Sequence, residues 1–265
     1  MFKICFNLPK KPVMHAKRRY IIILFLIYKN LQLKYKHSVL GFFWSLLHPF
    51  LYLLIFLMIF SAAFPAIQNY PLYVLSGLVF WIYFTNATMQ LSIVFIKNAH
   101  LIKSFNIPNT IYPITDLGSE LVSFLLGLIP FMIIMYFMGL KMSLNLLYLI
   151  PVIILFSVFI FSVGLILGSL NVFLRDVGIL WSTINPALFY LSPIAYSFKI
   201  VPERFKFIVK YNPLYHFLEI VRNVLYEGQA PSAHYVGRCL MITSVAAVMA
   251  FIIYRKTRNG FISNL

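Results

Sequence analysis

Six long apolar stretches divide this chain, and its charges lie almost entirely between them. Residues 39–64 and 72–96 contain no Asp, Glu, Lys or Arg, and as helices of about 37 Å each exceeds the ~30 Å hydrocarbon core of a bilayer. The other stretches cover residues 121–140, 146–170, 177–198 and 233–254. The sequence therefore predicts an all-α, polytopic membrane protein with six transmembrane helices.

The distribution of basic residues predicts how the spans are oriented. Of the 22 Lys and Arg, fifteen lie before the first stretch, in the second-to-third and fourth-to-fifth connections, or after the sixth. Segments rich in Lys and Arg stay on the cytoplasmic side, so we expect both termini in the cytoplasm. The net charge of +16 therefore indicates anionic membrane lipids as partners of the basic residues rather than nucleic acid.

The chain divides into two predicted parts. Residues 1–36 form a basic arm whose short apolar run cannot span a bilayer, so we expect a cytoplasmic amphipathic helix lying in the interface. Residues 37–265 form the six-span domain. Between spans five and six, residues 199–231 predict two short external amphipathic helices, near 202–210 and 213–226, broken at Asn212-Pro213.

Polar residues inside the second span follow a helical spacing. Thr85, Thr88 and Ser92 lie on one stripe, and Asn86 and Gln90 lie on a neighbouring one. Hydrogen bonding between helices explains such a stripe, and a face that lines a hydrated conduit is the alternative.

The carboxylates at the start of the third span are expected to be structural. Asp116 and Glu120 share one helix face, and without a partner motif we expect them to neutralise nearby Lys or Arg rather than to act as an acid–base pair. Arg175 and Asp176 occupy a predicted cytoplasmic turn, where we expect Arg175 to pair with Asp176, Glu120 or Asp116.

Sequence signatures of catalysis are missing. The sequence has no Gly-rich phosphate loop and therefore predicts no ATP site in this chain. Its six histidines lack metal-ligand spacing. Cys5 and Cys239 fall on opposite sides of the predicted membrane and cannot pair within one chain. We therefore expect a passage or scaffold without a metal or cofactor of its own, not an enzyme.

Four stretches resemble the permeases of ABC transporters that export polysaccharides. They are residues 33–49, the loop from Asn98 to Lys103 with Phe105, Ile107 and Pro108, the turn from Asn171 to Asp176, and the segment from Tyr211 to Leu214. They occur in the family's order and at its topological places. The resemblance runs from about residue 33 to residue 254.

This resemblance implies the membrane subunit of an ATP-driven exporter of lipid-linked O-antigen, capsule or teichoic-acid chains in a bacterial inner membrane. The chain would act as a homodimer with two copies of a separate ATP-binding cassette subunit, which binds ATP and Mg. The resemblance also implies that the basic arm and one loop dock the ATPase. The loop's candidate residues are Asn98, His100, Leu101, Ile102, Lys103 and Pro108.

The aromatic residues gain a possible role from this resemblance, because sugar rings stack on aromatic rings and conduction needs weak contacts at many points. The candidates for conduit lining are Tyr52, Phe56, Thr85, Thr88, Asn185 and Tyr190. Packing of the bundle is the simpler alternative for each. Two other functions stay open: a permease for drugs or small lipids, and a membrane glycosyltransferase that uses the external Glu residues.

Overall fold

The computed structural model describes residues 16–36, 44–60, 67–104, 107–140 and 143–265, and within these ranges regular structure is entirely helical. The first half comprises α1 (Ala16–Tyr35), α2 (Trp44–Phe60), α3 (Tyr70–Ser92), α4 (Val94–Lys97), α5 (Ala99–Ser104) and α6 (Ile111–Phe137). The second half comprises η2 (Leu144–Tyr148), α7 (Leu149–Asn171), α8 (Asp176–Leu191), η3 (Phe198–Ile200), α9 (Glu203–Tyr211), α10 (Pro213–Leu225), α11 (Ala233–Thr257), η4 (Arg258–Gly260) and α12 (Phe261–Asn264). The predicted all-α fold is confirmed.

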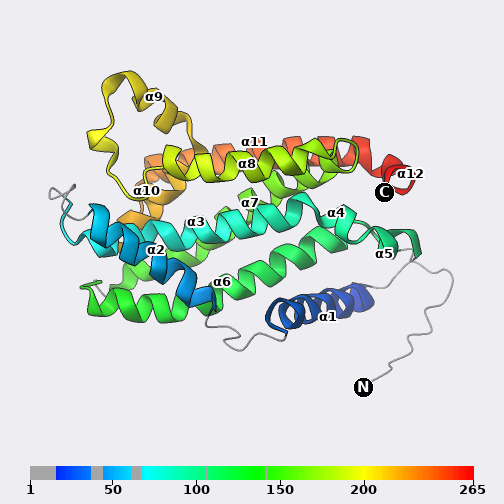
Figure 1. The fold of residues 1–265 in the computed structure, drawn as a ribbon, viewed down its shortest axis with the longest axis horizontal. Helices are drawn as coiled ribbons and strands as arrows, with labels where there is room; N and C mark the ends of the chain where they lie inside the picture. The colour runs from blue at the N-terminus through cyan, green and yellow to red at the C-terminus, as the bar shows by residue number, and fades with distance from the viewer. Residues whose placement is uncertain (1–15, 37–43, 61–66, 105–106, 141–142) are drawn as a thin grey trace.

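The long helices run side by side, so the molecule has two ends (Figure 1). At one end lie α4, α5 and α12, together with the turn that joins α7 to α8. At the other end α9 projects from the bundle, and the connection from α6 to α7 touches the segment after α10 through a hydrogen bond from Asn145 Nδ2 to Gly228 O. We call these the α5 end and the α9 end.

Helix α3 forms the centre of the bundle. It packs against α2, α6, α7, α8 and α10, and most of its residues are buried. Glycine makes the close approach of α7 to α3 possible: a Cβ built on Gly168 of α7 would stand 2.5 Å from the backbone oxygen of Leu91. Since that neighbour is backbone, it cannot rotate away, and only glycine fits.

Among the described residues, four helical segments are long and apolar enough to cross a membrane: Tyr70–Ser92, Ile111–Phe137, Leu144–Asn171 and Ala233–Asn264. They correspond to the second, third, fourth and sixth predicted spans. The first and fifth correspond to α2, with 17 residues, and α8, with 16 residues, or about 25 Å of helix each. The structure thus supports a polytopic membrane protein, while the count of six rests on these two shorter helices.

The shorter spans have separate explanations. Helix α8 ends at Leu191 because Pro193 disfavours helical backbone at the residue before it, Ser192. The predicted span to residue 198 is therefore too long. Both flanks of α2 (37–43 and 61–66) lie outside the described residues, as do residues 1–15 of the predicted arm. The break at Asn212 and Pro213 separates α9 from α10.

Helix α10 is far more buried than a helix on the surface would be. It packs against α3, α7 and α11, and its buried residues include Phe217, Val221 and Arg222. Helix α9 has a single buried residue, Val209. Of the two amphipathic helices expected in this segment, one is therefore part of the core and the other projects from it.

Candidate functional site

The α4–α5 segment forms a short bent connection at the α5 end. Helix α3 ends at Ser92, and the side chain of Asn98 caps α4, with Nδ2 donating to the backbone oxygen of Val94 at 2.8 Å. This amide turns the chain into α5. Of the residues expected to contact a partner, His100 and Lys103 are exposed, Leu101 is half-buried and Ile102 is buried.

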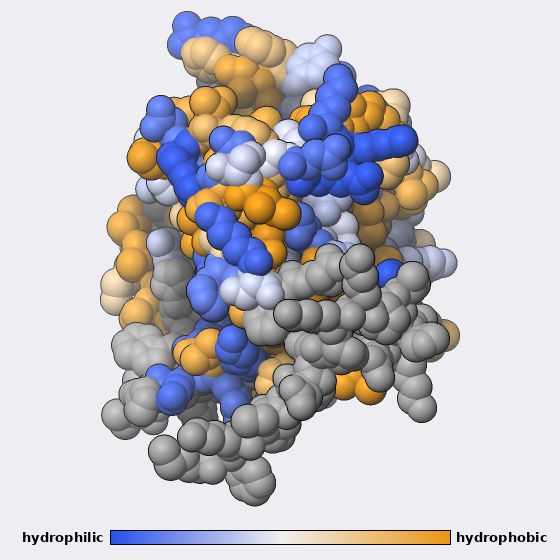
Figure 2. All heavy atoms as spheres, turned by 90° about the vertical axis from the view of Figure 1, so that its right-hand side faces the viewer, coloured by the Kyte–Doolittle hydropathy of each residue, from blue (hydrophilic) through white to orange (hydrophobic). Residues whose placement is uncertain are grey.

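A small apolar cluster fixes this segment to the bundle. Phe95 of α4 packs against Phe261 of α12, with ring centroids 4.6 Å apart, and both side chains are fully buried. Ile102 and Tyr112 join the same cluster. The apolar side of the segment is therefore anchored, while hydrophilic side chains gather over this end of the molecule (Figure 2). Pro108 lies half-buried in the coil before α6, apart from α5.

The turn between α7 and α8 lies at the same end. Arg175 is exposed and donates from Nη2 to the backbone oxygen of Asn264 at 3.5 Å. Within the described residues no ion pair includes Arg175, so its expected carboxylate partner is replaced by the backbone of α12. Asp176 is exposed in the first turn of α8, where the helix dipole stabilises a negative charge.

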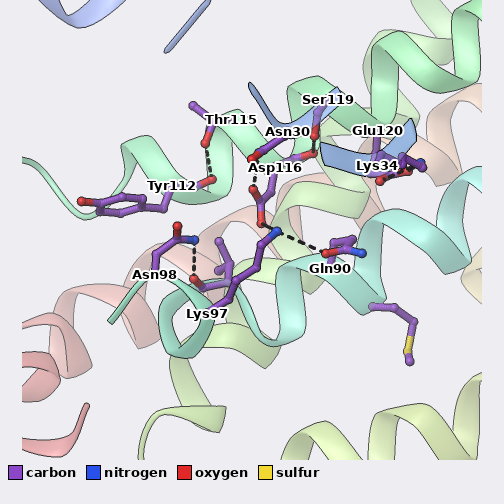
Figure 3. Close-up of polar contacts among 12 residues, drawn as sticks. Asn30, Lys34, Gln90, Lys97, Asn98, Tyr112, Thr115, Asp116, Ser119 and Glu120 are labelled. Atoms are coloured by element: carbon purple, nitrogen blue, oxygen red, sulfur yellow. Dashed lines mark hydrogen bonds and ion pairs between the residues drawn. The ribbon is translucent and has the colours of Figure 1, made fainter. Parts of the chain in front are cut away.

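The two carboxylates of α6 lie beside this end, and their basic partners are lysines rather than Arg175. Lys97 Nζ contacts Asp116 Oδ2 at 3.3 Å, and Lys34 Nζ contacts Glu120 Oε2 at 2.8 Å (Figure 3). Asn30 of α1 donates to the other oxygen of Asp116 at 2.7 Å. The prediction that these carboxylates neutralise nearby basic residues is confirmed.

An aromatic cluster joins α2, α3 and α8. Phe189 lies at its centre, with ring centroids 6.5 Å from Tyr52, 5.8 Å from Phe56 and 5.5 Å from Trp81. Tyr190 packs edge-on against Phe189 at 5.3 Å, and 75% of its surface stays exposed. The structure thus brings two candidates for conduit lining on α2, Tyr52 and Phe56, close to a third on α8, Tyr190. Phe189 and Trp81 were missed.

The polar stripe of α3 faces α8. Thr85 donates to Asn185 Oδ1 at 2.9 Å, and Trp181 Nε1 donates to Thr88 at 3.2 Å. Thr88 and Asn185 are buried. In the single chain these groups therefore join two helices, as the packing interpretation of the stripe expects.

The backbone break after α8 forms a second polar site, at the α9 end. Residues 192–196 are not helical, so their carbonyl groups need other donors. Arg222 of α10, 3% exposed, donates from Nη2 to Pro193 O and to Ile194 O, the latter at 2.9 Å. Tyr70 donates to Ala195 O at 2.9 Å, and Tyr73 donates to Tyr196 O at 3.0 Å.

Arg222 is held from the other side by an aromatic ring. Its guanidinium lies 3.8 Å from the ring centroid of Tyr73, a cation–π distance, and Glu219 Oε1 lies 3.5 Å from Nη1. Sequence reasoning missed this site. A single arginine on the otherwise apolar face of α10 was the available signal.

Burial shifts the pKa of two groups on α10. Desolvation raises the pKa of Glu219 above its ordinary value, although Arg222 opposes this shift. Desolvation lowers the pKa of His216, the hydrogen bond to the Lys210 backbone opposes this shift, and the positive charges of Arg238 and Lys210 add to it. The neutral His216 ring lies 3.0 Å from Lys210 O through Nε2. Burial therefore shifts the pKa of each group toward its uncharged form.

These features define a polytopic helical membrane protein. It has a bent polar connection at one end and, at the other, a non-helical segment whose carbonyl groups accept hydrogen bonds from buried side chains. The family model of the ABC-2 type transporter matches residues 22–226, which is most of the chain. The chain belongs to the ABC-2 type transporter family.

Several curated proteins are similar over nearly their whole length. Two proteins of Klebsiella pneumoniae called O-antigen export system permease protein RfbA are each 29% identical over 235 residues, covering 88% of this chain and 90% of theirs. A protein of the same name from Myxococcus xanthus is 23% identical over 248 residues, covering 92% of this chain and 95% of its own.

Proposed function

We propose that this chain is the membrane subunit of an ATP-driven ABC exporter that moves lipid-linked polysaccharide across the bacterial inner membrane. The observation that carries the proposal is the near full-length similarity to O-antigen export permeases. The absence of a phosphate loop from the sequence fits this role, because hydrolysis of ATP then falls to a partner subunit.

The polymer transported is testable in cells. Deleting the gene should leave finished O-antigen, capsule or teichoic-acid chains in the cytoplasm, detected by fractionation and by antibody labelling of intact and opened cells. Accumulation of a drug or a small lipid without any polymer defect would instead identify the other kind of exporter. Failure to extend the polymer would identify a glycosyltransferase.

The α4–α5 segment is the proposed docking surface for the ATPase. Since Ile102 is buried and anchors the segment, the exposed His100 and Lys103 are the side chains offered to a partner. We expect Lys103→Glu to lower the amount of ATPase that co-purifies with the permease. Lys210→Glu is the matched control, because Lys210 is an exposed lysine in the last turn of α9 at the opposite end. Equal recovery of ATPase from both variants would reject the surface.

The proposed topology has six spans, with α2 and α8 as the first and fifth, and both termini in the cytoplasm. The alternation of connections supports it: α4–α5, the Arg175 turn and α12 share one end, and α9 lies at the other (Figure 1). In a background without Cys5, cysteine at Ala230 should react with an impermeant reagent outside intact cells, and cysteine at Ser104 should not. Both positions are exposed. The reverse pattern would invert the topology.

We further propose that two copies of the chain, with two ATPase subunits, enclose the path. The support is helix α8, whose described side chains are exposed or half-buried except for Asn185, although the helix is apolar. The aromatic cluster around Phe189 ends in the exposed Tyr190 beside this surface. Cysteine at Tyr190 should react with water-soluble reagents during turnover if the path runs here, and should stay unreactive if this surface is packed against lipid.

A further inference from the structure

Two buried carboxylates on one face of α6 differ in how many helices they hold (Figure 3). Glu120 uses both oxygens on one partner, the ammonium of Lys34, at 3.0 and 2.8 Å. Asp116 divides its oxygens: Oδ1 accepts from Asn30 of α1, and Oδ2 accepts from Lys97 of α4. Glu120 therefore joins α6 to α1, whereas Asp116 joins α6 to α1 and to α4 at once.

The position of Lys97 gives this junction its mechanical meaning. Lys97 is the last residue of α4, directly before Asn98, whose side chain caps α4 where the chain turns into α5. A displacement of the α4–α5 segment must therefore move the ammonium that contacts Asp116. Asp116 lies in the second turn of α6, so the same displacement acts on the start of a long helix.

Burial makes Asp116 depend on its partners more strongly than a carboxylate in a surface contact would. The side chain of Asp116 is 4% exposed, whereas that of Lys97 is 42% exposed. A buried carboxylate needs its partners, because desolvating an unpaired charge is costly, but a partly exposed ammonium can find water. Apolar residues could fill the same space at similar stability, so the value of the arrangement lies in the three elements that it connects.

We propose that Asp116 is a positioning residue of the transport cycle, which passes movement of the α4–α5 segment to α6 and to the N-terminal helix α1 together. This role rests on the proposed function, since the movement comes from a partner ATPase. Helix α1 then moves with the nucleotide state of the ATPase through its hydrogen bond to Asp116. The Lys34–Glu120 pair holds α1 against α6 but does not connect α1 to α4.

Hydrogen exchange measured on the permease–ATPase complex in nanodiscs tests this assignment without a transported substrate. The variants are Asp116→Asn, which keeps the shape and an acceptor for Asn30 but removes the charge that holds Lys97, and the matched control Glu120→Gln. In the unchanged complex, adding ATP should alter exchange in peptides from both α1 and α4–α5.

The two variants should differ in how hydrogen exchange in α1 responds to ATP. In Asp116→Asn the response of α4–α5 to ATP should remain and that of α1 should disappear. In Glu120→Gln, α1 should exchange about tenfold faster in both nucleotide states, because an ionic hydrogen-bonded contact is lost, yet should still respond to ATP. An α1 response in Asp116→Asn equal to that of the unchanged protein would overturn the proposal.

Exchanging the charges provides the rescue. In Lys97→Asp with Asp116→Lys the ion pair is reversed, and Asn30 can present its amide oxygen to the new ammonium. The double variant should recover the α1 response, whereas Lys97→Asp alone should not. Equal loss in both would show that Asp116 acts through folding only and would contradict the proposal. Loss of the polymer assignment in cells would leave these exchange results unchanged, so the two failures are distinguishable.

Discussion

The two ends of the bundle both bury ionic groups, but they use them on different partners. At the α5 end, Asp116 and Glu120 contact side chains, two of which are lysines that reach the surface. At the α9 end, Arg222 donates to the backbone oxygens of Pro193 and Ile194, in the non-helical segment after α8. Lysine side chains have several rotamers and can shift while staying paired, whereas a backbone carbonyl moves only with its chain segment. The comparison indicates an adjustable junction at the α5 end and a fixed closure at the α9 end.

The largest effect should come from breaking the fixed closure. Arg222→Gln removes a buried guanidinium from two backbone oxygens, from Glu219 and from the ring of Tyr73, and should destabilise the permease by about 3–5 kcal/mol. The measurement is the yield and melting temperature of detergent-purified protein. Arg222→Lys keeps the charge and should lose less. Normal melting of Arg222→Gln would remove the contrast between the ends.

A single hydroxyl of the same closure should have a smaller effect. Tyr73→Phe keeps the ring beneath Arg222 but leaves Tyr196 O without its donor, so about 1 kcal/mol of stability should be lost. Thr257→Val, which removes a hydroxyl that donates within α11, provides a comparison at the α5 end. If both changes shift the melting temperature equally, the hydroxyl of Tyr73 contributes nothing particular to the break.

The α9 end should also respond to pH. Because the folded pKa of His216 is lowered, its contribution to stability is complete above its ordinary value of 6.5 and is lost as the pH falls from there through the folded value. Melting temperatures between pH 7.5 and 5.5 should fall more in the natural protein than in His216→Gln, whose amide can still donate to Lys210 O. Glu219, with its raised pKa, acts in the opposite direction and is common to both proteins. Parallel curves would exclude His216 as the group responsible.

The smallest effect on stability is expected at the adjustable end. A Cβ on Gly118 of α6 would meet Ile27 Cδ1 of α1 at 2.7 Å, the flexible end of a side chain that can turn aside. Alanine also gains about 1 kcal/mol of helix propensity over glycine, so Gly118→Ala should melt near the natural temperature while α1 exchanges hydrogen faster. A large fall in melting temperature would show that the α5 end is as rigid as the closure.

The sequence predicted the helical membrane architecture well, because apolar length is a property of each segment alone. It also predicted that Asp116 and Glu120 meet basic residues. It could not predict which ones: Lys34 lies 86 residues from Glu120, and the choice depends on how α1 docks on α6. Arg175 was expected to pair with Asp176, Glu120 or Asp116, but both carboxylates of α6 pair with lysines.

The α9 end was harder to predict because its order comes from tertiary contacts. The predicted fifth span ran past Pro193 to residue 198, whereas helix α8 ends at Leu191. The donors that satisfy the freed carbonyls come from α3 and α10, far away in the sequence. Phe189 was missed for a related reason. Nothing distinguishes it locally from other phenylalanines, and its central place in the aromatic cluster follows from the approach of α2 to α8.

The side chain of Asn171 has a consequence for the order of synthesis. Its Nδ2 donates to the backbone oxygen of Ser92 at 2.8 Å, at the end of α3, and its Oδ1 accepts from the backbone of Gly178 at 3.1 Å. Asn171 follows Ser92 by 79 residues, so at about 5–20 residues per second a ribosome supplies this amide roughly 4–16 s after the end of α3 has emerged. Until then the end of α3 must rely on water or on the insertion machinery, and three helices become locked together only when translation has passed the start of α8.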